Sequence, residues 1–295
     1  MKKLLPIMLG IMMIFFITAC TDQTEQAKDN TNEKEAEITK IKIGMIPDQN
    51  TADLNRSMDD FAKDLGEKTG LEVEFVPSVD YAALVTAFER GEIHLAWFGG
   101  LTGVQARNLV PESEAIAQRP IDQQFKSVFI ANSEVKINSL EELKGKTFTF
   151  GSESSTSGHL MPRYFVMEAG INPEKDLDGT PNYSGSHDKT YKLVESGAYQ
   201  TGALNISVWE AAVKEGKVDT TKVKVFYTTP EYYDYNWTVN KMDKETKTKI
   251  KDAILSMKAG DNEVMNLLQT DKFIETNNDN YKAIEEVAKE LKIIK

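Results

Sequence analysis

The feature that most constrains the fold is a repeated alternation of short strand-like and helix-like segments. Apolar and polar residues alternate at 41–46 and 71–76, the period of a strand, and apolar residues at helical spacing follow each run, at 52–69 and 80–90. This order continues along the chain. Strands that alternate with helices in this way predict a mostly parallel α/β sheet, whose ligand sites lie at the carboxyl ends of the strands.

One predicted junction between a strand and a helix is unusually rich in hydroxyl groups. Thr and Phe alternate at 147–150 as in a strand, and an apolar-periodic helix is expected from Leu160 to Ala169. Between them lies the run 154–157, Ser-Ser-Thr-Ser. A Ser-rich helix cap would account for such a loop. Four consecutive hydroxyls at a helix start favour an anion site instead, and no lysine completes a nucleotide-binding phosphate loop.

The N-terminal residues predict export from the cytoplasm. Lys2 and Lys3 precede an apolar run that ends at Cys20, the only cysteine in the chain. This run is shorter than the roughly 20 residues that a membrane span needs, so we expect residues 1–19 to be a signal peptide. Residues 17–20, Ile-Thr-Ala-Cys, resemble a bacterial lipobox. Cys20 would then be the lipidated first residue of the mature protein, anchored to the outer face of the membrane.

Composition separates a tether from a folded region. Residues 20–37 hold no large apolar side chain and read as a flexible tether. Residues 38–295 exceed the usual size of a single core, which favours two lobes. The formal net charge is −11, and it becomes −13 without Lys2 and Lys3. No basic stripe is present, so nucleic acid is a poor candidate partner, and an anionic ligand would need local donors.

Four short motifs, in order along the chain, resemble the phosphonate-binding (PhnD-like) solute-binding proteins of ABC importers. They are Asp80-Tyr81-Ala82-Ala83, Ala96-Trp97-Phe98-Gly99-Gly100-Leu101-Thr102, Ser155-Thr156-Ser157-Gly158 and Gly185-Ser186-His187-Asp188. The resemblance covers residues 41–290. The form of residues 97–107 is closest to a branch labelled as selenate binders.

The resemblance implies a type II periplasmic-binding-protein-like fold, in which two α/β lobes are joined by two crossing hinge strands. Lobe 1 would comprise 38–130 and 236–295, and lobe 2 would comprise 131–235. The crossings would fall near 129–133 and 228–238, with the ligand between the lobes. A monomer that delivers its ligand to an ABC permease and ATPase is implied, without a cofactor or a metal.

The resemblance also indicates ligand-binding residues. Three consecutive hydroxyl residues match the family's oxyanion cradle, and a histidine in a Gly-Ser turn matches its cleft histidine: Ser155, Thr156, Ser157 and His187. A surface role is the alternative for the histidine. Tyr81, Trp97 and Phe98 would line the wall of lobe 1, although aromatic residues at strand ends more often belong to the core.

Three further positions bear on the identity of the ligand. Asp234 matches an aspartate of the crossing loop that accepts a hydrogen bond from a protonated anion, which favours a ligand with an –OH or –NH group. Ser207 stands where binders of aminoalkylphosphonates place a carboxylate. Gln200 stands where many relatives have Asp, and its neutral amide can donate as well as accept.

The sequence therefore predicts a binding protein for a small tetrahedral oxyanion of the phosphonate, phosphite or phosphate type. A selenate or sulfate binder of the same fold is the alternative. A hydrolase of small anionic esters is a further one, but the chain has no Gly-x-Ser-x-Gly elbow, no Ser-x-x-Lys and no zinc spacing among its three histidines. We expect no catalytic residues. A cell-surface adhesin or scaffold without a ligand is the remaining possibility.

Overall fold

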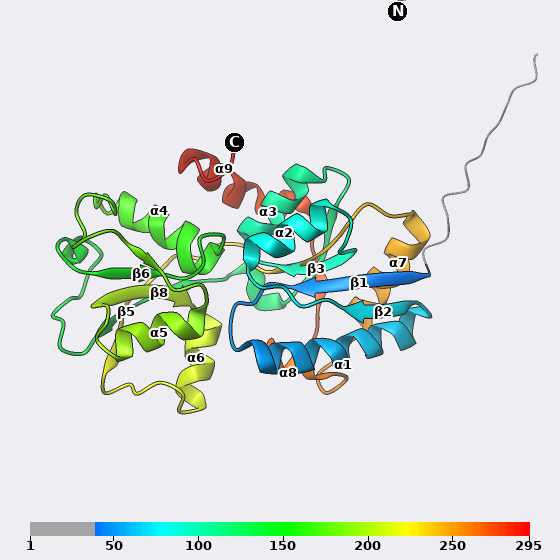
Figure 1. Ribbon diagram of the computed structural model, residues 1–295, viewed down its shortest axis with the longest axis horizontal. Coiled ribbons are helices and arrows are strands. Elements are labelled where there is room, and N and C mark those ends of the chain that lie inside the picture. Colours follow the sequence, from blue (N-terminus) through cyan, green and yellow to red (C-terminus); the bar gives the residue numbers. More distant parts are fainter. Residues whose placement is uncertain (1–38) are drawn as a thin grey trace, which may run out of the picture. The chain divides into compact units, whose positions relative to one another are not determined.

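The computed structural model describes residues 39–295, which form two lobes, each built around a β-sheet with helices packed on it (Figure 1). The predicted signal peptide, the tether and Cys20 lie outside the described residues. Among residues 39–295, no helix is long and apolar enough to cross a membrane.

Lobe 1 contains a six-stranded sheet in the order β11-β4-β10-β3-β1-β2. Its strands are β1 (Lys40–Met45), β2 (Glu72–Phe75), β3 (Leu95–Phe98), β4 (Glu114–Gln118), β10 (Asn236–Val239) and β11 (Ile274–Glu275). Its helices are α1 (Thr51–Thr69), α2 (Tyr81–Glu89), α3 (Gly100–Leu109), α7 (Lys244–Ser256), α8 (Glu263–Leu267), η4 (Asn278–Tyr281) and α9 (Lys282–Glu290).

Lobe 2 contains a five-stranded sheet in the order β7-β6-β8-β5-β9. Its strands are β5 (Ser127–Asn132), β6 (Phe148–Phe150), β7 (Asn182–Tyr183), β8 (Thr201–Asn205) and β9 (Val223–Thr228). Its helices are η2 (Glu141–Leu143), η3 (Thr156–Leu160), α4 (Met161–Glu168), α5 (His187–Glu195) and α6 (Ile206–Lys214).

The two sheets share one topology, because the order β2-β1-β3-β10-β4 in lobe 1 repeats as β7-β6-β8-β5-β9 in lobe 2. Both sheets are mixed, but four of the six strands of lobe 1 and four of the five strands of lobe 2 run in the same direction, so the expectation of mostly parallel strands is confirmed. The strand that follows a crossing, β5 in lobe 2 and β10 in lobe 1, runs antiparallel to its neighbours. Each crossing brings the chain into the sheet from the cleft side, which reverses the direction of that strand.

The two crossings run side by side between the lobes. The first includes η1 (Pro120–Gln123) and leads from β4 to β5, and the second leads from β9 to β10. Phe125 and Tyr232 form an isolated antiparallel bridge between them. The predicted start of lobe 2 at residue 131 falls inside β5, whose whole length pairs in the second sheet.

Local capping residues determine where the helices that face the cleft begin and end. Asn50 caps α1 by accepting from the N–H groups of Ala52 and Asp53, and Gly70 ends that helix in a left-handed conformation. Asp80 caps α2 by accepting from the Ala83 N–H at 2.7 Å. Both caps follow a strand of lobe 1, so the N-termini of these helices lie at the carboxyl edge of its sheet.

The core of lobe 1 is aromatic around β3 and β10. The rings of Phe61 on α1 and Trp237 on β10 stack at 4.7 Å, and Trp97 packs against Trp237. These side chains are fully buried. The strand that returns from lobe 2 is therefore fixed at the centre of the lobe 1 core.

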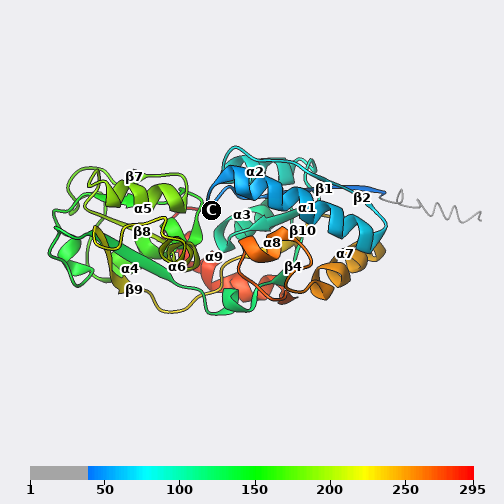
Figure 2. The ribbon, with the colours of Figure 1, turned by 90° about the horizontal axis from the view of Figure 1, so that it is seen from below.

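The C-terminal helix α9 packs on α3 of lobe 1 and also touches η3 of lobe 2 (Figures 1 and 2). Apolar residues of η3 and α4 in lobe 2 belong to the same hydrophobic cluster as apolar residues of the C-terminal segment: Leu160, Met161, Tyr164, Phe165, Val287, Leu291, Ile293 and Ile294. The last residues of the chain thus contribute to the contact between the lobes.

Candidate functional site

The candidate site lies where the carboxyl ends of the strands of both lobes face each other. In lobe 1, β1 leads to Asp48 and β3 leads through Gly99 to the start of α3. In lobe 2, β6 leads to Ser155, and β7 leads to His187 at the start of α5. Several helix N-termini therefore converge on one place, and each contributes unpaired N–H groups and partial positive charge.

The hydroxyl-rich junction of lobe 2 forms a helix start that is buried between the lobes. Ser155, Thr156 and Ser157 are each at most 2% exposed. The Ser155 hydroxyl accepts from the Gly158 N–H at 2.9 Å and caps η3, a π-helical turn that continues into α4. The helix thus begins at Thr156, four residues before the predicted start. Wide turns of this kind are frequent at functional sites.

The start of α3 in lobe 1 meets this junction directly. The Leu101 N–H donates to the Thr156 hydroxyl at 2.9 Å, and the Gly100 N–H donates to Asp234 Oδ1, also at 2.9 Å. A Cβ at Gly99 would lie 3.2 Å from the Thr156 hydroxyl and 3.3 Å from Asp234 Oδ1. The glycines of this turn therefore allow lobe 1, lobe 2 and the second crossing to come close together.

Asp234 is a buried carboxyl on the second crossing. Its Oδ2 has no hydrogen-bond partner among the described residues. Burial raises the pKa of Asp234 to about 7, although the Gly100 N–H and the Thr156 hydroxyl favour the charged form. At neutral pH this carboxyl can therefore either accept a hydrogen bond from a protonated ligand oxygen or, when it is protonated itself, donate a hydrogen bond to a charged ligand oxygen.

His187 belongs to a network that joins both lobes. Its Nδ1 accepts from the Asn205 N–H at 3.4 Å, so its Nε2 carries the hydrogen and donates to the Tyr235 hydroxyl at 3.3 Å. Tyr235 also accepts from Asn205 Nδ2 and donates to Asp48 Oδ2. Burial lowers the pKa of His187 to about 4, so the ring is neutral near pH 7.

Four buried polar atoms in this region have no hydrogen-bond partner among residues 39–295. They are Asp48 Oδ1, the Tyr81 hydroxyl, the Ser157 hydroxyl and Asp234 Oδ2. Burial is the main reason that the pKa of Tyr81 lies well above its ordinary value. The charges of Asp48 and Asp234 raise this pKa further, so the phenol lies near both carboxyls. An unpaired buried polar atom is costly, so such a group of donors and acceptors indicates a polar binding site.

The predicted aromatic wall is divided between site and core. Tyr81 presents its hydroxyl as described above. Trp97 stacks on Tyr235 at 5.7 Å, and the Phe98 ring packs edge-on against Phe88 of α2. Trp97 thus supports the ring of Tyr235, while Phe98 belongs to the core of lobe 1.

Two predicted residues are not brought to the centre of the site. Gln200 precedes β8, at the end of the strand away from the cleft, where its side chain accepts from the Thr147 N–H at 3.0 Å. It holds two strands in register there. Ser207 is half-buried on α6, and its carbonyl accepts from Gln269 of lobe 1 at 3.4 Å. Ser207 therefore lies at the rim of the contact between the lobes.

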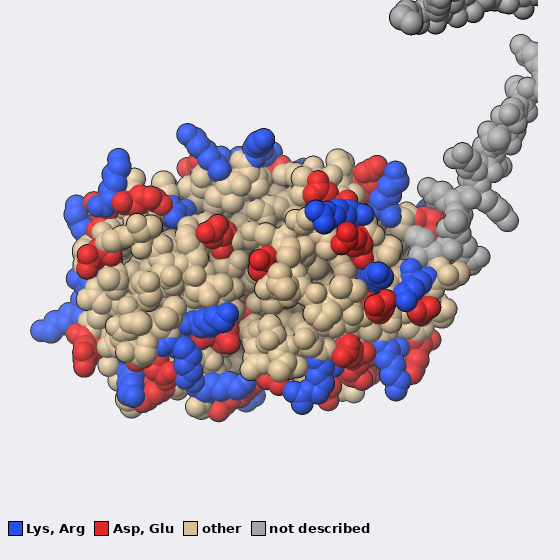
Figure 3. All heavy atoms as spheres, viewed as in Figure 1, with Lys and Arg blue, Asp and Glu red and all other residues tan. Residues whose placement is uncertain are grey.

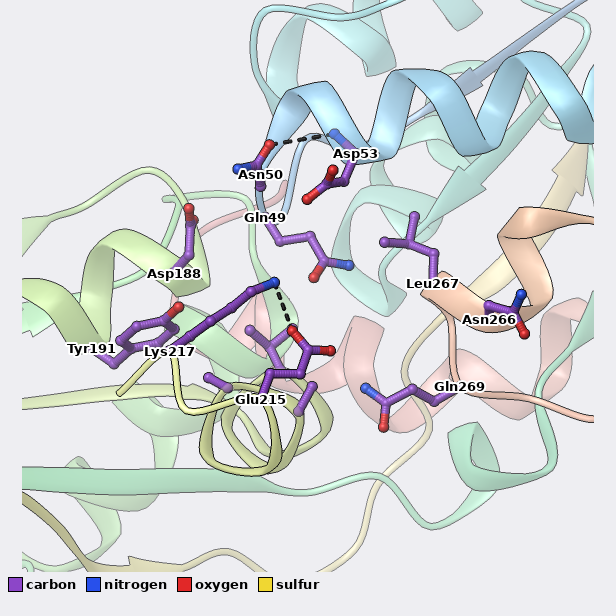
Figure 4. A pocket seen from close by; sticks show the side chains of 13 residues that line it. Gln49, Asn50, Asp53, Asp188, Tyr191, Glu215, Lys217, Asn266, Leu267 and Gln269 are labelled. Carbon is purple, nitrogen blue, oxygen red and sulfur yellow. Dashed lines mark hydrogen bonds and ion pairs between the residues drawn. The ribbon is translucent and has the colours of Figure 1, made fainter. Parts of the chain in front are cut away.

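A cavity of about 160 Å³ lies between the lobes beside the site (Figure 4). Gln49, Asn50 and Asp53 line it from lobe 1, and Asp188 and Lys217 from lobe 2. Gln49 and Asp188 follow Asp48 and His187 in sequence. The His187 N–H donates to the Asp48 carbonyl at 2.9 Å, so this backbone contact joins the lobes between the cavity and the site.

The charged side chains and His159 also bear on the expectations from the sequence. On the face shown in Figure 3, acidic and basic side chains are interspersed. Among the described residues, no group of three or more His, Cys, Asp or Glu could hold a metal ion. His159 contacts the Glu153 carbonyl at 2.6 Å and Arg163 at 2.9 Å, which indicates a structural role.

The two lobes have matching topology, are joined by two crossings and enclose a polar site. This arrangement is that of a two-lobed substrate-binding protein. Residues 43–281 match the family described as ABC transporter, phosphonate, periplasmic substrate-binding protein. The chain belongs to this family, which is extracytoplasmic and is a transport family, not an enzyme family.

The relatives agree with this assignment. The chain is 39% identical to the probable ABC transporter phosphite binding protein PhnD1 of Prochlorococcus marinus, over 86% of this chain and 91% of the relative. The structure of PhnD1 in complex with methylphosphonate has a TM-score of 0.83 and covers 87% of this chain and 99% of its own. A binding protein component of an ABC phosphonate transporter from Pseudomonas aeruginosa has a TM-score of 0.75 at 25% identity, covering 85% of this chain and 86% of its own.

The structure adds site residues that were not predicted. Asp48 and Asn205 join Tyr235 in the network around His187, the Leu101 N–H reaches Thr156 of lobe 2, and the Gly100 N–H reaches the second crossing. Asp48 follows the predicted first strand after Pro47, so the rule that ligand sites lie at carboxyl ends of strands could have found it.

Proposed function

We propose that this protein is the solute-binding component of an ABC importer and binds a small tetrahedral oxyanion of the phosphonate, phosphite or phosphate type between its lobes. Ser155, Thr156 and Ser157 supply hydroxyl and backbone donors, Tyr81 and His187 flank them, and Asp234 pairs with a protonated ligand atom. The proposal rests on the contacts that join the start of η3, the start of α3 and Asp234. It also rests on the 39% identity of the chain to a probable phosphite binding protein.

Binding closes the two lobes over the anion. The hydrogen bonds from Leu101 to Thr156 and from His187 to Asp48 join opposite lobes, so they form only when the lobes meet. Closure excludes water and strengthens the hydrogen bonds to the anion. The closed form is the one that the permease recognises, with an ATPase as the energy source, and the binding protein acts as a monomer. Its position at the membrane is kept by lipidation of Cys20.

Calorimetry of the protein without residues 1–20 tests the ligand class, with methylphosphonate, phosphite, phosphate, selenate and sulfate compared at two pH values. We expect the monoprotonated anions to bind more tightly than sulfate or selenate. A preference for selenate or sulfate would support the alternative oxyanion class. If none of the five anions binds or raises the melting temperature, the proposal fails.

Replacement of Cys20 by Ala tests the anchor separately. The variant should lose labelling by a fatty-acid probe and appear in the soluble fraction, whereas the wild-type protein should remain with the membrane. Unchanged fractionation would contradict a lipid anchor without affecting the ligand proposal.

A further inference from the structure

Asp48 is a buried carboxyl that the contacts between the lobes leave half-satisfied. Its side chain is 3% exposed, and its carbonyl accepts from the His187 N–H across the lobe boundary at 2.9 Å. Its Oδ2 accepts from the Tyr235 hydroxyl at 3.0 Å, while Oδ1 has no partner among the described residues. A carboxyl oxygen buried in this way costs free energy unless something donates a hydrogen bond to it.

Asp234 is arranged in the same way. Its Oδ1 accepts from the Gly100 N–H, the hydroxyls of Thr156 and Ser157 favour its charged form, and no partner lies within hydrogen-bonding geometry of its Oδ2 among residues 39–295. Tyr81 lies near both groups, since the charges of Asp48 and Asp234 both act on its phenol. Two carboxyls therefore border the region that the hydroxyls of Ser155, Thr156 and Ser157 face. In each carboxyl, one oxygen accepts a hydrogen bond from the protein and the other oxygen has no partner among the described residues.

We propose that Asp48 is a second ligand-facing carboxyl of the anion site. With Asp234 it selects a monoprotonated phosphonate- or phosphite-type anion over a fully ionised tetrahedral dianion. This inference rests on the proposed function. It follows from counting hydrogen atoms, because a carboxylate oxygen and an anion oxygen can approach to hydrogen-bonding distance only when one of them carries a proton.

The surroundings of Asp48 decide where its proton resides. The charged and titratable groups that act on Asp48 or contact it come from both lobes and the crossings: Tyr81, Arg119, His187, Asp188 and Tyr235. Arg119 favours the charged carboxylate, but it also pairs with Asp122 at 2.7 Å, and Asp188 acts in the opposite sense. Burial has the largest effect and raises the pKa of Asp48 to about 6.

The proton balance then differs between ligand classes. A fully ionised dianion brings no proton, so each carboxyl that faces it must take one from solvent. A ligand that is already monoprotonated in solution brings one, so uptake from solvent falls by one at a pH below the second pKa of that ligand. Above pH 7 both carboxyls are mostly ionised before binding, and the uptake therefore penalises the dianion increasingly as the pH rises.

The first test needs no variant. Calorimetry of wild-type protein at pH 8, in two buffers that differ in ionisation enthalpy, gives the number of protons taken up on binding. We expect about two for sulfate, since both carboxyls take their protons from solvent, and nearly as many for methylphosphonate, because most of it is a dianion at pH 8 and takes up the proton with which it binds. Uptake of only one proton on sulfate binding would mean that Asp234 acts alone, and would overturn the proposal for Asp48.

The second test replaces Asp48 by Asn, which is nearly isosteric and needs no proton to donate to an anion. Sulfate should bind about tenfold or more tightly to the variant at pH 8, with proton uptake lower by about one. The ratio of methylphosphonate to sulfate affinity should fall accordingly. The matched control is Asp279→Asn, which removes the same charge from an exposed carboxylate of lobe 1 that pairs with Lys282 and does not line the cavity. Its affinity ratio should equal that of wild-type protein.

The outcomes separate the two proposals. If wild-type protein binds none of the anions, the proposed function itself fails. If the anions bind but Asp48→Asn keeps the wild-type affinity ratio and proton uptake, the proposed function stands, and Asp48 is only a structural contact between the lobes. A variant that does not fold leaves the wild-type proton count to decide.

Discussion

The two lobes repeat one topology, but they bring opposite chemistry to the site. Lobe 2 contributes the donor hydroxyls of Ser155, Thr156 and Ser157, and its His187 ring holds Tyr235 beside them. Lobe 1 contributes the carboxyl of Asp48, and the second crossing contributes Asp234, both buried with one unpaired oxygen. The comparison indicates a division of labour, in which lobe 2 holds the charge of an anion while lobe 1 and the crossing test its protonation.

The largest loss of anion affinity is expected when a negative charge is placed at the helix start of lobe 2. In Thr156→Asp, a carboxylate would face the anion at the helix start, so calorimetry should detect no binding. Thr156→Ala, which removes one hydroxyl, should weaken binding about tenfold or more, since a hydrogen bond to a charged group is worth roughly 1.5–3 kcal/mol. The control is Thr248→Asp, which adds the same charge at an exposed position of α7 in lobe 1 and should keep the wild-type affinity. Wild-type affinity in Thr156→Asp would show that the anion is not held at this helix.

A smaller effect is expected from separating the lobes sterically. In Gly99→Ala, the new methyl group would meet Thr156 of lobe 2 and Asp234 of the crossing at 3.2–3.3 Å. The backbone of Gly99 is ordinary for any residue, at φ −74° and ψ 167°, so lobe 1 should fold normally. We expect affinity to fall about tenfold. Small-angle scattering should show less compaction with ligand than in wild-type protein. Equal compaction would mean that the lobes do not meet at Gly99.

The protonation of Asp234 should be visible in stability without ligand. Its pKa of about 7 in the folded protein exceeds the ordinary value of 3.8, so the folded state binds more protons between these values. Its contribution to stability is therefore complete below about pH 4 and is lost as the pH rises through 7.

Urea unfolding from pH 5 to pH 8 would measure this contribution as the difference between wild-type protein and Asp234→Asn. The free energy of unfolding of the wild type should fall relative to the variant by up to about 1.4 kcal/mol per pH unit. Parallel pH profiles would mean that Asp234 is already ionised in the folded protein.

The smallest effect is expected at Gln200. Because it lies at the far end of β8 from the cleft, Gln200→Ala should leave anion affinity within about twofold of wild type. The same variant should lower stability slightly, since the Thr147 N–H loses its acceptor. A large loss of affinity with unchanged stability would contradict the placement of the site.

Most of the fold was predictable because helical and strand periods are local properties. The strand β4 was missed because its sequence, Glu-Ala-Ile-Ala-Gln, contains a single large apolar residue, and its burial depends on pairing with β10 more than 100 residues later. The shared hinge topology came from the resemblance to a family and not from residue periods.

The site was only partly predictable, because some of its residues have a local sequence signature whereas others are buried only by packing between the lobes. A run of hydroxyls at a helix start has a local signature, so Ser155, Thr156 and Ser157 could be selected from the sequence. Asp48 stands in a turn that is rich in cap-forming residues, and only the packing of lobe 2 against it buries its carboxyl. Gln200 was selected by its resemblance to a position of the family, and that resemblance does not specify at which end of a strand a residue lies.

The position of the crossings also determines how the chain can assemble as it is made. All strand pairs of lobe 2 form within residues 127–228, one continuous segment. The sheet of lobe 1 is joined in its middle by β10, which pairs with β3 across more than 130 residues. Closing so long a loop is slow compared with local contacts. Lobe 2 can therefore acquire its structure from a partial chain, whereas lobe 1 stays incomplete until β10 is available. A nascent chain thus presents the hydroxyl side of the site well before the opposing side can close over it.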